Sequence, residues 1–218
     1  EIGLGIPAEP LFRSSIGGYY KAWAIPRQLT KMKGEPIVAR TIRLLKEAGI
    51  SNIYISSHDE RFSDFAPLLK HENNFQGYVE HGGSWVDAFY PTDEPACYIM
   101  GDVVFSPEAI NKIVNTNTND ILFFASSPPF SKLYIKEDAE PFAFKVVNQK
   151  RFREAINYVK QNEESGIFRR RPIAWELWQV LNGEDVRKIN YYNYIAINDY
   201  TCDIDRVEDI SKIESVIP

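Results

Sequence analysis

Acidic residues that follow apolar segments are the first candidates for chemistry in this sequence. Gly101 and Asp102 come directly after the apolar run 97–100, and Asp203 and Asp205 lie close to the C-terminus. In an extended segment, residues 203 and 205 point to one face, where two carboxylates repel each other unless a cation lies between them. Because Mg²⁺ takes one or two protein carboxylates and completes its shell with water and substrate phosphate, Asp203 and Asp205 indicate a magnesium site.

Each of these acids also has an ordinary structural interpretation. Asp102 alone could be a turn or helix-capping aspartate after a strand. Asp205 could cap a helix that begins near Val207, with Glu208 completing a capping box. The cap and the metal edge are compatible roles for Asp205, so both interpretations stay open.

A glycine pair before a short helical stretch is the next candidate site. Gly82, Gly83 and Ser84 precede Trp85 and a stretch that we expect to be helical up to Phe89. Two glycines and a serine at a helix start present backbone N–H groups that suit a base, a ribose or a phosphate. The alternative is a tight turn with an ordinary N-cap serine.

The middle of the chain offers candidates for binding a second substrate. Lys145 lies in an apolar segment that we predict to be a strand, where an unpaired lysine is uncommon, and Glu140 is its expected partner or a hydrogen-bonding group for a hydroxyl. Arg171 ends a basic triplet before a helix that carries Trp175 and Glu176. This set predicts a phosphate clamp with an aromatic wall, although a basic triplet is more often a solvated turn.

The elements that must position these residues alternate between strands and helices in the first half. Short apolar runs at 53–56, 97–100 and 121–125 are typical of buried parallel strands. A helix is expected after Pro36, which we place in its first turn, and it should end at Gly49. A second helix should begin at Pro107 with Ser106 as its cap. The β-α-β-α-β order predicts an α/β fold with a mostly parallel sheet.

The second half has a mixed order. We predict longer strands at 142–147 and 189–197 and helices at 150–161 and 173–182. This region is expected to extend the same domain on the substrate side.

Composition excludes several classes of protein. The 218 residues contain 25 Lys and Arg against 30 Asp and Glu, so the net charge of −5 disfavours a nucleic-acid partner. No apolar run approaches the ~20 residues that a membrane span needs. Cys97 and Cys202 are expected to be buried thiols in a reducing cytosol, and a zinc site lacks ligands.

Three segments together resemble a known family. They are the region from IPRQL (25–29) through GEPIVARTI (34–42) to Gly49-Ile50, the segment YIMGDVVFSPEAI (98–110), and CDIDRVEDI (202–210). In this order they resemble the nucleotidyltransferase superfamily of GT-A-like fold, which includes sugar-1-phosphate nucleotidyltransferases and phosphocholine cytidylyltransferases. The resemblance implies a Rossmann-like three-layer α/β/α fold with a mostly parallel mixed sheet. It also implies one domain over 1–218, with a nucleotide-binding half (1–125) and an acceptor-side half (126–218) that ends in the metal-binding segment.

The resemblance implies a Mg²⁺-dependent reaction. A nucleoside triphosphate, with CTP or UTP favoured, would be joined to a sugar phosphate or a small phosphorylated alcohol, with release of pyrophosphate. Transferred to this sequence, the metal ligands are Asp102, Asp203 and Asp205, Arg27 is the cation beside the phosphates, and Gly83 and Ser84 contact the base and ribose. Together with the residue-type arguments above, this gives Arg27, Asp102 and Lys145 as the expected catalytic residues and Lys21, Arg27, Gly82, Gly83 and Ser84 as the nucleotide-binding residues. The expected acceptor-binding residues, from the residue types alone, are Glu140, Lys145, Arg171, Trp175 and Glu176. The implied setting is the bacterial cytoplasm and polysaccharide biosynthesis, and a homodimer is compatible with it.

The sequence departs from the family pattern at two points. Arg27 stands where the family has a lysine. The family also begins with a strand and a glycine-rich phosphate loop, whereas no strand is evident before Gly3. Two alternatives therefore stay open: a GT-A-type glycosyltransferase that uses a nucleotide sugar, although Val103 and Val104 stand where a second metal-binding acid is usual, and a non-catalytic nucleotide-binding module.

Overall fold

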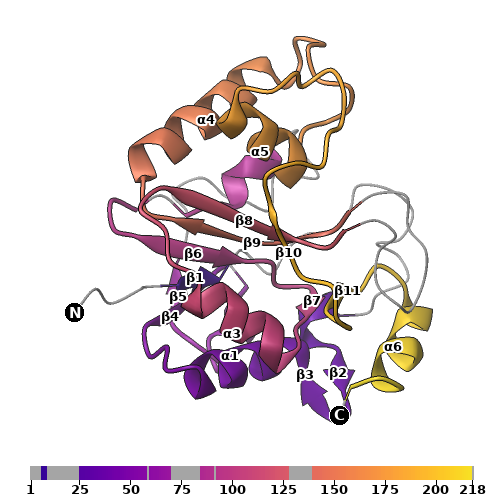
Figure 1. The fold of residues 1–218 in the computed structure, drawn as a ribbon. Helices are drawn as coiled ribbons and strands as arrows, with labels where there is room; N and C mark the ends of the chain where they lie inside the picture. The colour runs from indigo at the N-terminus through magenta and orange to yellow at the C-terminus, as the bar shows by residue number, and fades with distance from the viewer. Residues whose placement is uncertain are drawn as a thin grey trace.

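A seven-stranded mixed sheet forms the centre of the computed structural model, which describes residues 6–8, 25–57, 59–69, 84–90, 92–127 and 139–217 (Figure 1). The strand order is β10-β8-β9-β6-β1-β4-β5. Only β9 runs antiparallel to its neighbours β6 and β8; the other described pairs are parallel. The strands are β1 (Ile6–Ala8), β4 (Ile53–Ser56), β5 (Leu68–Leu69), β6 (Ala96–Ile99), β8 (Ile121–Ala125), β9 (Pro141–Val146) and β10 (Ile195–Ala196).

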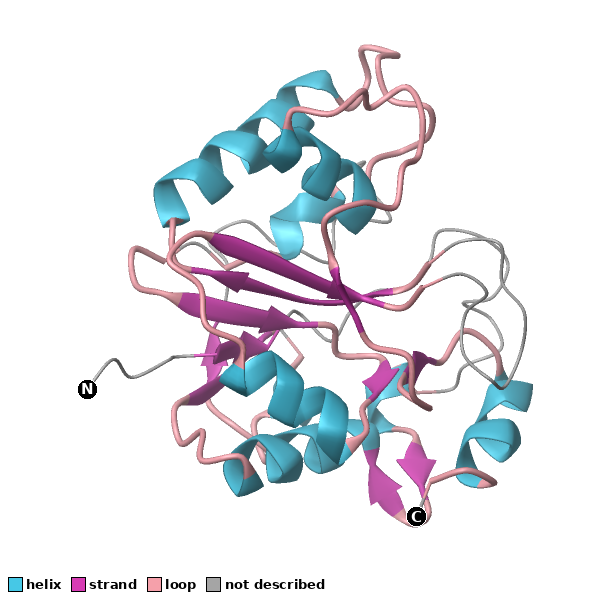
Figure 2. Cartoon of the chain, viewed as in Figure 1, coloured by secondary structure: helices cyan, strands magenta, loops and turns pink. Residues whose placement is uncertain are grey.

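Helices cover both faces of this sheet. On one face lie α1 (Ile37–Glu47) and α3 (Pro107–Asn115), and on the other lie α4 (Gln149–Asn162) and α5 (Ala174–Asn182) (Figures 1 and 2). The apolar residues of α1 recur at helical spacing and are buried against the sheet. Gly49, at φ +88°, ends that helix in the left-handed conformation that glycine adopts without strain. The expected three-layer α/β/α architecture and mostly parallel mixed sheet are confirmed.

Smaller elements lie beyond the central sheet. Two antiparallel ribbons join β7 (Val103–Val104) to β11 (Cys202–Asp203) and β2 (Lys31–Met32) to β3 (Glu35–Pro36). The remaining described elements are the 3₁₀ helices η2 (Arg27–Leu29), η3 (Glu60–Phe62) and η4 (Trp85–Ala88) and the helix α6 (Val207–Glu214). Among the described residues no helix is long and apolar enough to cross a membrane.

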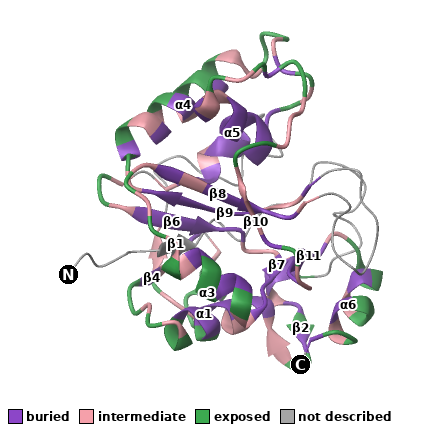
Figure 3. Ribbon diagram, viewed as in Figure 1, coloured by how far each residue is buried: buried purple, intermediate pink, exposed green. Residues whose placement is uncertain are grey.

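Aromatic side chains fill the core between the sheet and the α4–α5 layer. Phe144 on β9 stacks on Phe123 of β8 at 4.4 Å between ring centroids, and Phe89 contacts Tyr98 and Phe152 edge-on at 5.1 Å each. Such pairs add to the stabilisation that burial of their apolar area provides. Figure 3 shows the result, with buried central strands and exposed outer helix faces. The sheet is therefore a rigid base for the loops at its edges.

The structure differs from the sequence predictions at three points. The strand expected at 189–197 is reduced to β10, because Asn193 has φ +58° and breaks the extended chain just before it. A strand that the sequence pattern did not reveal, β1, occupies the central position between β6 and β4. Pro36 precedes α1 as its N-cap and is not in the first turn.

Candidate functional site

The carboxyl edge of the sheet carries the candidate site. Asp102 follows β6 after Gly101, and Ser126 follows β8. Because β9 is antiparallel, Glu140 at its start lies at the same edge, where its N–H donates to Ser126 Oγ at 2.9 Å. In open α/β sheets the crevice at this edge is the usual position of a ligand.

The C-terminal segment reaches this edge through the β7–β11 ribbon. Cys202 pairs with Val104 and Asp203 with Val103, and the N–H of Ile204 donates to the carbonyl of Asp102 at 3.1 Å. Residues 203 to 205 therefore run alongside Asp102, although they are far from it in sequence. We expected Asp102, Asp203 and Asp205 to lie close together, and the pairing of their main chains agrees with this expectation. The region formed by these three acids is called the corner below.

Arg27 of η2 lies between two of these acids. One of its amino groups, Nη2, is 2.7 Å from Asp102 Oδ2, and the other, Nη1, is 3.2 Å from Asp205 Oδ1 and also donates to the carbonyl of Ile204. The arginine is only 8% exposed. Burial by itself lowers the pKa of the guanidinium, but Asp102, Asp205 and Asp203 outweigh this effect and raise that pKa. Arg27 is therefore permanently charged and forms ion pairs with Asp102 and Asp205.

The start of α6 corrects one interpretation of Asp205. The helix begins at Val207 as expected, but its N-cap is Arg206. The carboxylate of Asp209 accepts hydrogen bonds from the N–H groups of Arg206 at 2.8 Å and Asp205 at 3.2 Å. Asp209 thus takes the capping role, and the Asp205 carboxylate is directed to Arg27.

The acids suit magnesium by their chemistry. Carboxylate oxygens are the ligands that Mg²⁺ prefers, and one or two suffice when substrate phosphate supplies the rest. Within the described residues, no group of three or more His, Cys, Asp or Glu side chains is arranged to hold a metal ion alone. The corner fits Mg²⁺ only if phosphate or water completes the shell and if Arg27 leaves the oxygens that it now contacts.

Residues that the sequence analysis missed fix this corner in place. Ser106, the N-cap of α3, donates from Oγ to Asp199, and its N–H donates to Thr201 Oγ1 at 3.0 Å. Arg40 of α1 contacts the Tyr200 hydroxyl at 3.2 Å. These contacts tie the segment before β11 to two helices. No motif marks them, because each joins positions that are distant in the chain.

Ser84 is the one predicted loop residue for nucleotide binding that the structure describes. It precedes η4, is 5% exposed, and its N–H donates to Asp87 Oδ2 at 3.0 Å. Its Oγ has no hydrogen-bond partner among the described residues, which is unusual for a buried hydroxyl. Lys21, Gly82 and Gly83 lie outside the described residues.

Lys145 does not lie at the carboxyl edge, and its expected pairing with Glu140 is wrong. Glu140 precedes the start of β9, whereas Lys145 is near its end and pairs with Cys97 at the amino end of β6. The ammonium donates to carbonyls at the C-terminal end of α3: Val114 and Thr116 at 2.8 Å and Ile113 at 3.3 Å. An apolar strand tolerates this lysine because the helix end satisfies its charge.

The other predicted acceptor residues also have structural partners. Glu176 is fully buried, accepting from Arg170 Nε at 2.7 Å and from the N–H of Ile173 at 2.9 Å. Arg171 pairs with Glu163 at 2.8 Å. Trp175 is 1% exposed and donates from Nε1 to the carbonyl of Ala139 at 2.7 Å.

Trp175 therefore acts on the edge only indirectly, by holding the residue before Glu140. Next to it, Tyr194 donates to Ser127 Oγ at 3.1 Å, and the Asn198 side chain accepts from the N–H of Ser127 at 3.1 Å. None of these polar groups was predicted: Ser127 follows β8, Tyr194 immediately precedes β10, and Asn198 follows it. They form a hydrogen-bonded cluster next to Ser126, which is the partner of Glu140.

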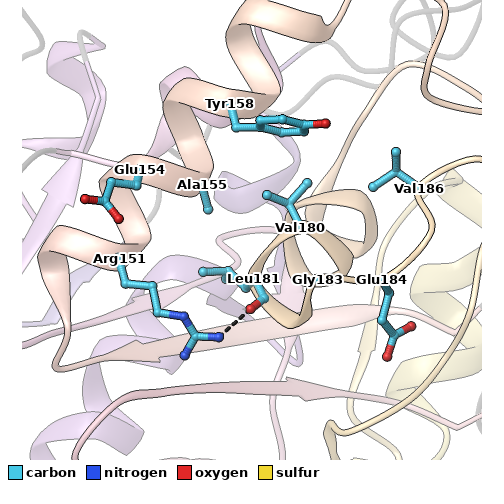
Figure 4. A pocket seen from close by; sticks show the side chains of 9 residues that line it. All are labelled: Arg151, Glu154, Ala155, Tyr158, Val180, Leu181, Gly183, Glu184 and Val186. Atoms are coloured by element: carbon cyan, nitrogen blue, oxygen red, sulfur yellow. Dashed lines mark hydrogen bonds between the residues drawn. The ribbon is translucent and has the colours of Figure 1, made fainter.

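A separate hollow of about 440 Å³ lies between α4 and α5 (Figure 4). Its lining residues are Arg151, Glu154, Ala155, Tyr158, Val180, Leu181, Gly183, Glu184 and Val186. None of the predicted site residues lines it. Arg151 in its wall is already bonded to Asp120 and to the carbonyl of Leu181.

Solved structures of low sequence identity share this fold. The chain is similar to a Bacillus anthracis structure described as a glucose-1-phosphate thymidylyltransferase, with a TM-score of 0.51, 13% identity and 92% of each chain covered. It is also similar to 4-diphosphocytidyl-2C-methyl-D-erythritol synthase from Anaerococcus prevotii, with a TM-score of 0.55, 12% identity, and 86% of this chain and 91% of that chain covered. No protein-family model and no curated protein matches the sequence. The shared property is the fold.

Proposed function

We propose that this chain is a nucleotidyltransferase that joins a nucleoside monophosphate unit, from CTP or UTP, to a sugar phosphate or a small phosphorylated alcohol. The observation that supports it most strongly is the meeting of Asp102 and Asp205 on Arg27 at the carboxyl edge of the sheet. This edge is where α/β folds of this kind hold nucleotides. The forked guanidinium of Arg27 suits phosphate oxygens, and the carboxylates suit the Mg²⁺ that accompanies phosphate.

The reaction needs one bond to form and one to break. A phosphate oxygen of the acceptor attacks the α-phosphorus, the bond from that phosphorus to the bridging oxygen of the β-phosphate breaks, and pyrophosphate leaves with the electron pair. Arg27 would bind and neutralise phosphate oxygens, while Asp102 and Asp205 would hold Mg²⁺ and Asp203 would add negative charge nearby. Bound Mg²⁺ supplies further neutralisation of phosphate charge. The protein contributes mainly by positioning the two phosphates in line.

The remaining roles follow the arrangement of the edge. Ser84, with Gly82, Gly83 and Lys21, is proposed to contact the nucleotide, and the Oγ of Ser84, which has no hydrogen-bond partner within the described part of the chain, supports this role. The carboxylate of Glu140 is proposed to accept a hydrogen bond from a hydroxyl group of the second substrate, the sugar phosphate or phosphorylated alcohol. Lys145, Trp175 and Glu176 are left out of direct binding, since the first is bonded at the opposite edge and the other two are buried in the core.

The glycosyltransferase alternative gains no support from the geometry. Such enzymes commonly place a second acid beside the first, but Val103 and Val104 are buried in β7. The non-catalytic alternative rested on the missing glycine-rich loop. Residues 9–24, which follow β1, lie outside the described residues, so this alternative stays open. A cytoplasmic bacterial setting, a role in polysaccharide biosynthesis and a homodimer stay predictions.

The test is release of pyrophosphate. The full chain is incubated with Mg²⁺, each of the four ribonucleoside triphosphates and dTTP, and a panel of sugar 1-phosphates and phosphorylated alcohols. Pyrophosphate that appears only when an acceptor is present supports the proposal. Sugar transfer from a nucleotide sugar without pyrophosphate would replace it with the glycosyltransferase, and nucleotide binding without any turnover would replace it with the binding module.

A matched pair of variants links that activity to the site. Asp102→Asn removes the charge at the carboxyl end of β6. Asp93→Asn makes the same change before the amino end of that strand, where the side chain is 87% exposed. Only the first should remove most of the pyrophosphate release.

A further inference from the structure

Arg27 occupies the position that a metal ion would need. Its two amino groups each face a different carboxylate, at 2.7 Å from Asp102 and 3.2 Å from Asp205. Mg²⁺ binds carboxylate oxygens at about 2.0–2.1 Å. A metal on these same oxygens would lie next to the guanidinium, and two cations in contact repel strongly in a partly buried place. The guanidinium and the metal therefore compete for the same oxygens.

The charge balance of the corner favours an exchange. Arg27 brings one positive charge to Asp102 and Asp205, and Asp203 also acts on it electrostatically. A divalent ion brings two charges and suits the same donors. Once displaced, the guanidinium needs a new anionic partner, because a buried unpaired charge is costly.

We propose that Arg27 is an exchangeable counter-ion, which keeps Asp102 and Asp205 paired until a divalent cation takes their oxygens and a phosphate takes the released guanidinium. This inference rests on the proposed function for its phosphate, but the competition between Arg27 and a metal ion can be measured without any substrate. It gives Arg27 a second role besides phosphate binding.

The side chain is suited to this exchange because it is a planar fork. Arginine presents separate N–H groups to two acids at once, while lysine is a point charge that pairs well with one. The fork also matches phosphate in a bidentate manner. An arginine can thus pass from two carboxylates to one phosphate and keep two strong contacts in each state.

Coupling between the two ligands follows from the exchange. Metal binding alone leaves the guanidinium without its acids, and phosphate binding alone leaves the acids without their cation. When both bind, every charge has a partner. Metal and nucleotide should therefore strengthen each other's binding, and this coupling is reciprocal.

The experiment measures Mn²⁺ binding to the full chain by electron paramagnetic resonance, with no nucleotide present. The variants are Arg27→Gln, which removes the competing charge, and Arg27→Lys, which keeps a charge with one point contact. Arg43→Gln is the control, because Arg43 is also bonded to two acids, Glu35 and Glu47, but its side chain lies on the solvent-exposed face of α1.

The expected result is Mn²⁺ binding about tenfold tighter in Arg27→Gln than in the unaltered chain, which is the scale of one moderately buried ion pair. Arg27→Lys should be intermediate and Arg43→Gln unchanged. Equal or weaker Mn²⁺ binding by Arg27→Gln would overturn the proposal.

Thermal unfolding separates this effect from simple destabilisation. Without metal, Arg27→Gln should melt lower than the unaltered chain, because its acids repel one another. Mg²⁺ should raise its melting temperature by more than that of the unaltered chain. If Arg27→Gln does not fold, Arg27→Lys decides: tighter Mn²⁺ binding supports the exchange, and equal or weaker binding refutes it.

The two proposals fail in different ways. Tighter Mn²⁺ binding by Arg27→Gln, without any pyrophosphate release by the unaltered chain, would refute the proposed function and support the exchange. Pyrophosphate release by the unaltered chain, with equal Mn²⁺ affinity in Arg27→Gln, would support the function and refute the exchange.

Discussion

Replacement of Lys145 by methionine should destabilise the fold and leave substrate binding intact. The lysine is 4% exposed, and its ammonium donates to three carbonyls at the C-terminal end of α3. Methionine keeps an unbranched apolar stem in the strand but removes the donors. The carbonyls of Ile113, Val114 and Thr116 then lose a charged partner.

The size of the effect follows from these contacts. A hydrogen bond from a charged donor contributes roughly 1.5–3 kcal/mol, and an unsatisfied buried acceptor costs about 1–3 kcal/mol. Burial of the ammonium opposes this gain and lowers the pKa of Lys145, so the contributions do not simply add. We expect a net loss of roughly 2 to 4 kcal/mol of unfolding free energy. At about 2–4 °C per kcal/mol for a chain of this size, the melting temperature should fall by about 10 °C.

Urea unfolding and acceptor kinetics together test this reasoning. The urea midpoint of Lys145→Met should fall, while the KM for the acceptor phosphate should stay within twofold of the unaltered value. Lys150→Met is the control, since Lys150 is exposed on α4 and its loss should cost less than about 0.5 kcal/mol. An unchanged urea midpoint combined with a raised acceptor KM would refute the structural role and restore Lys145 to the acceptor site.

Three further predictions concern the site and its supports. Asp102→Asn should lower the rate of pyrophosphate release by about 10²–10³-fold, the usual cost of losing one electrostatic group at a reacting phosphate, while circular dichroism shows an intact fold; near-normal turnover would place the metal elsewhere. Asp209→Ala should cost about 1 kcal/mol in urea unfolding through loss of the α6 cap, and an unchanged midpoint would argue against that cap. Burial raises the pKa of the Cys97 thiol from 9.0 to about 12, so the unfolded chain ionises first and stability is lost as pH rises above 9. At pH 10 this loss is about 1.4 kcal/mol, and Cys97→Ala should show a correspondingly shallower decline in urea midpoint between pH 8 and 10; parallel curves would contradict it.

Local patterns predicted much of the fold because they act over a few residues. The strands at 53–56 and 121–125 were placed correctly, as apolar runs between turn residues must be buried. Helix α5 starts at Ala174, one residue after the predicted start. The failures came from conformations that depend on a single residue or on the rest of the sheet. Asn193 shortens β10, and β1 is a strand of three residues that is defined by its two neighbours.

The site could be predicted only in part. The meeting of Asp102 with the C-terminal acids was predicted only through the resemblance to the nucleotidyltransferase family. The partners of those acids could not be predicted, because the distance between Arg27 and Asp205 depends on how η2 and β11 pack. For Lys145 the residue type was informative, but its partners are main-chain carbonyls that no side-chain pattern reveals.

A ligand-bound structure tests the central claim most directly. The chain would be crystallised with Mg²⁺ and a triphosphate analogue that cannot be cleaved at the α-phosphorus. The account predicts the phosphates at the carboxyl edge of the sheet, within hydrogen-bonding distance of the Arg27 guanidinium and with Asp102 on the metal. A nucleotide in the hollow between α4 and α5, or one that leaves Arg27 bonded to both acids, would contradict it.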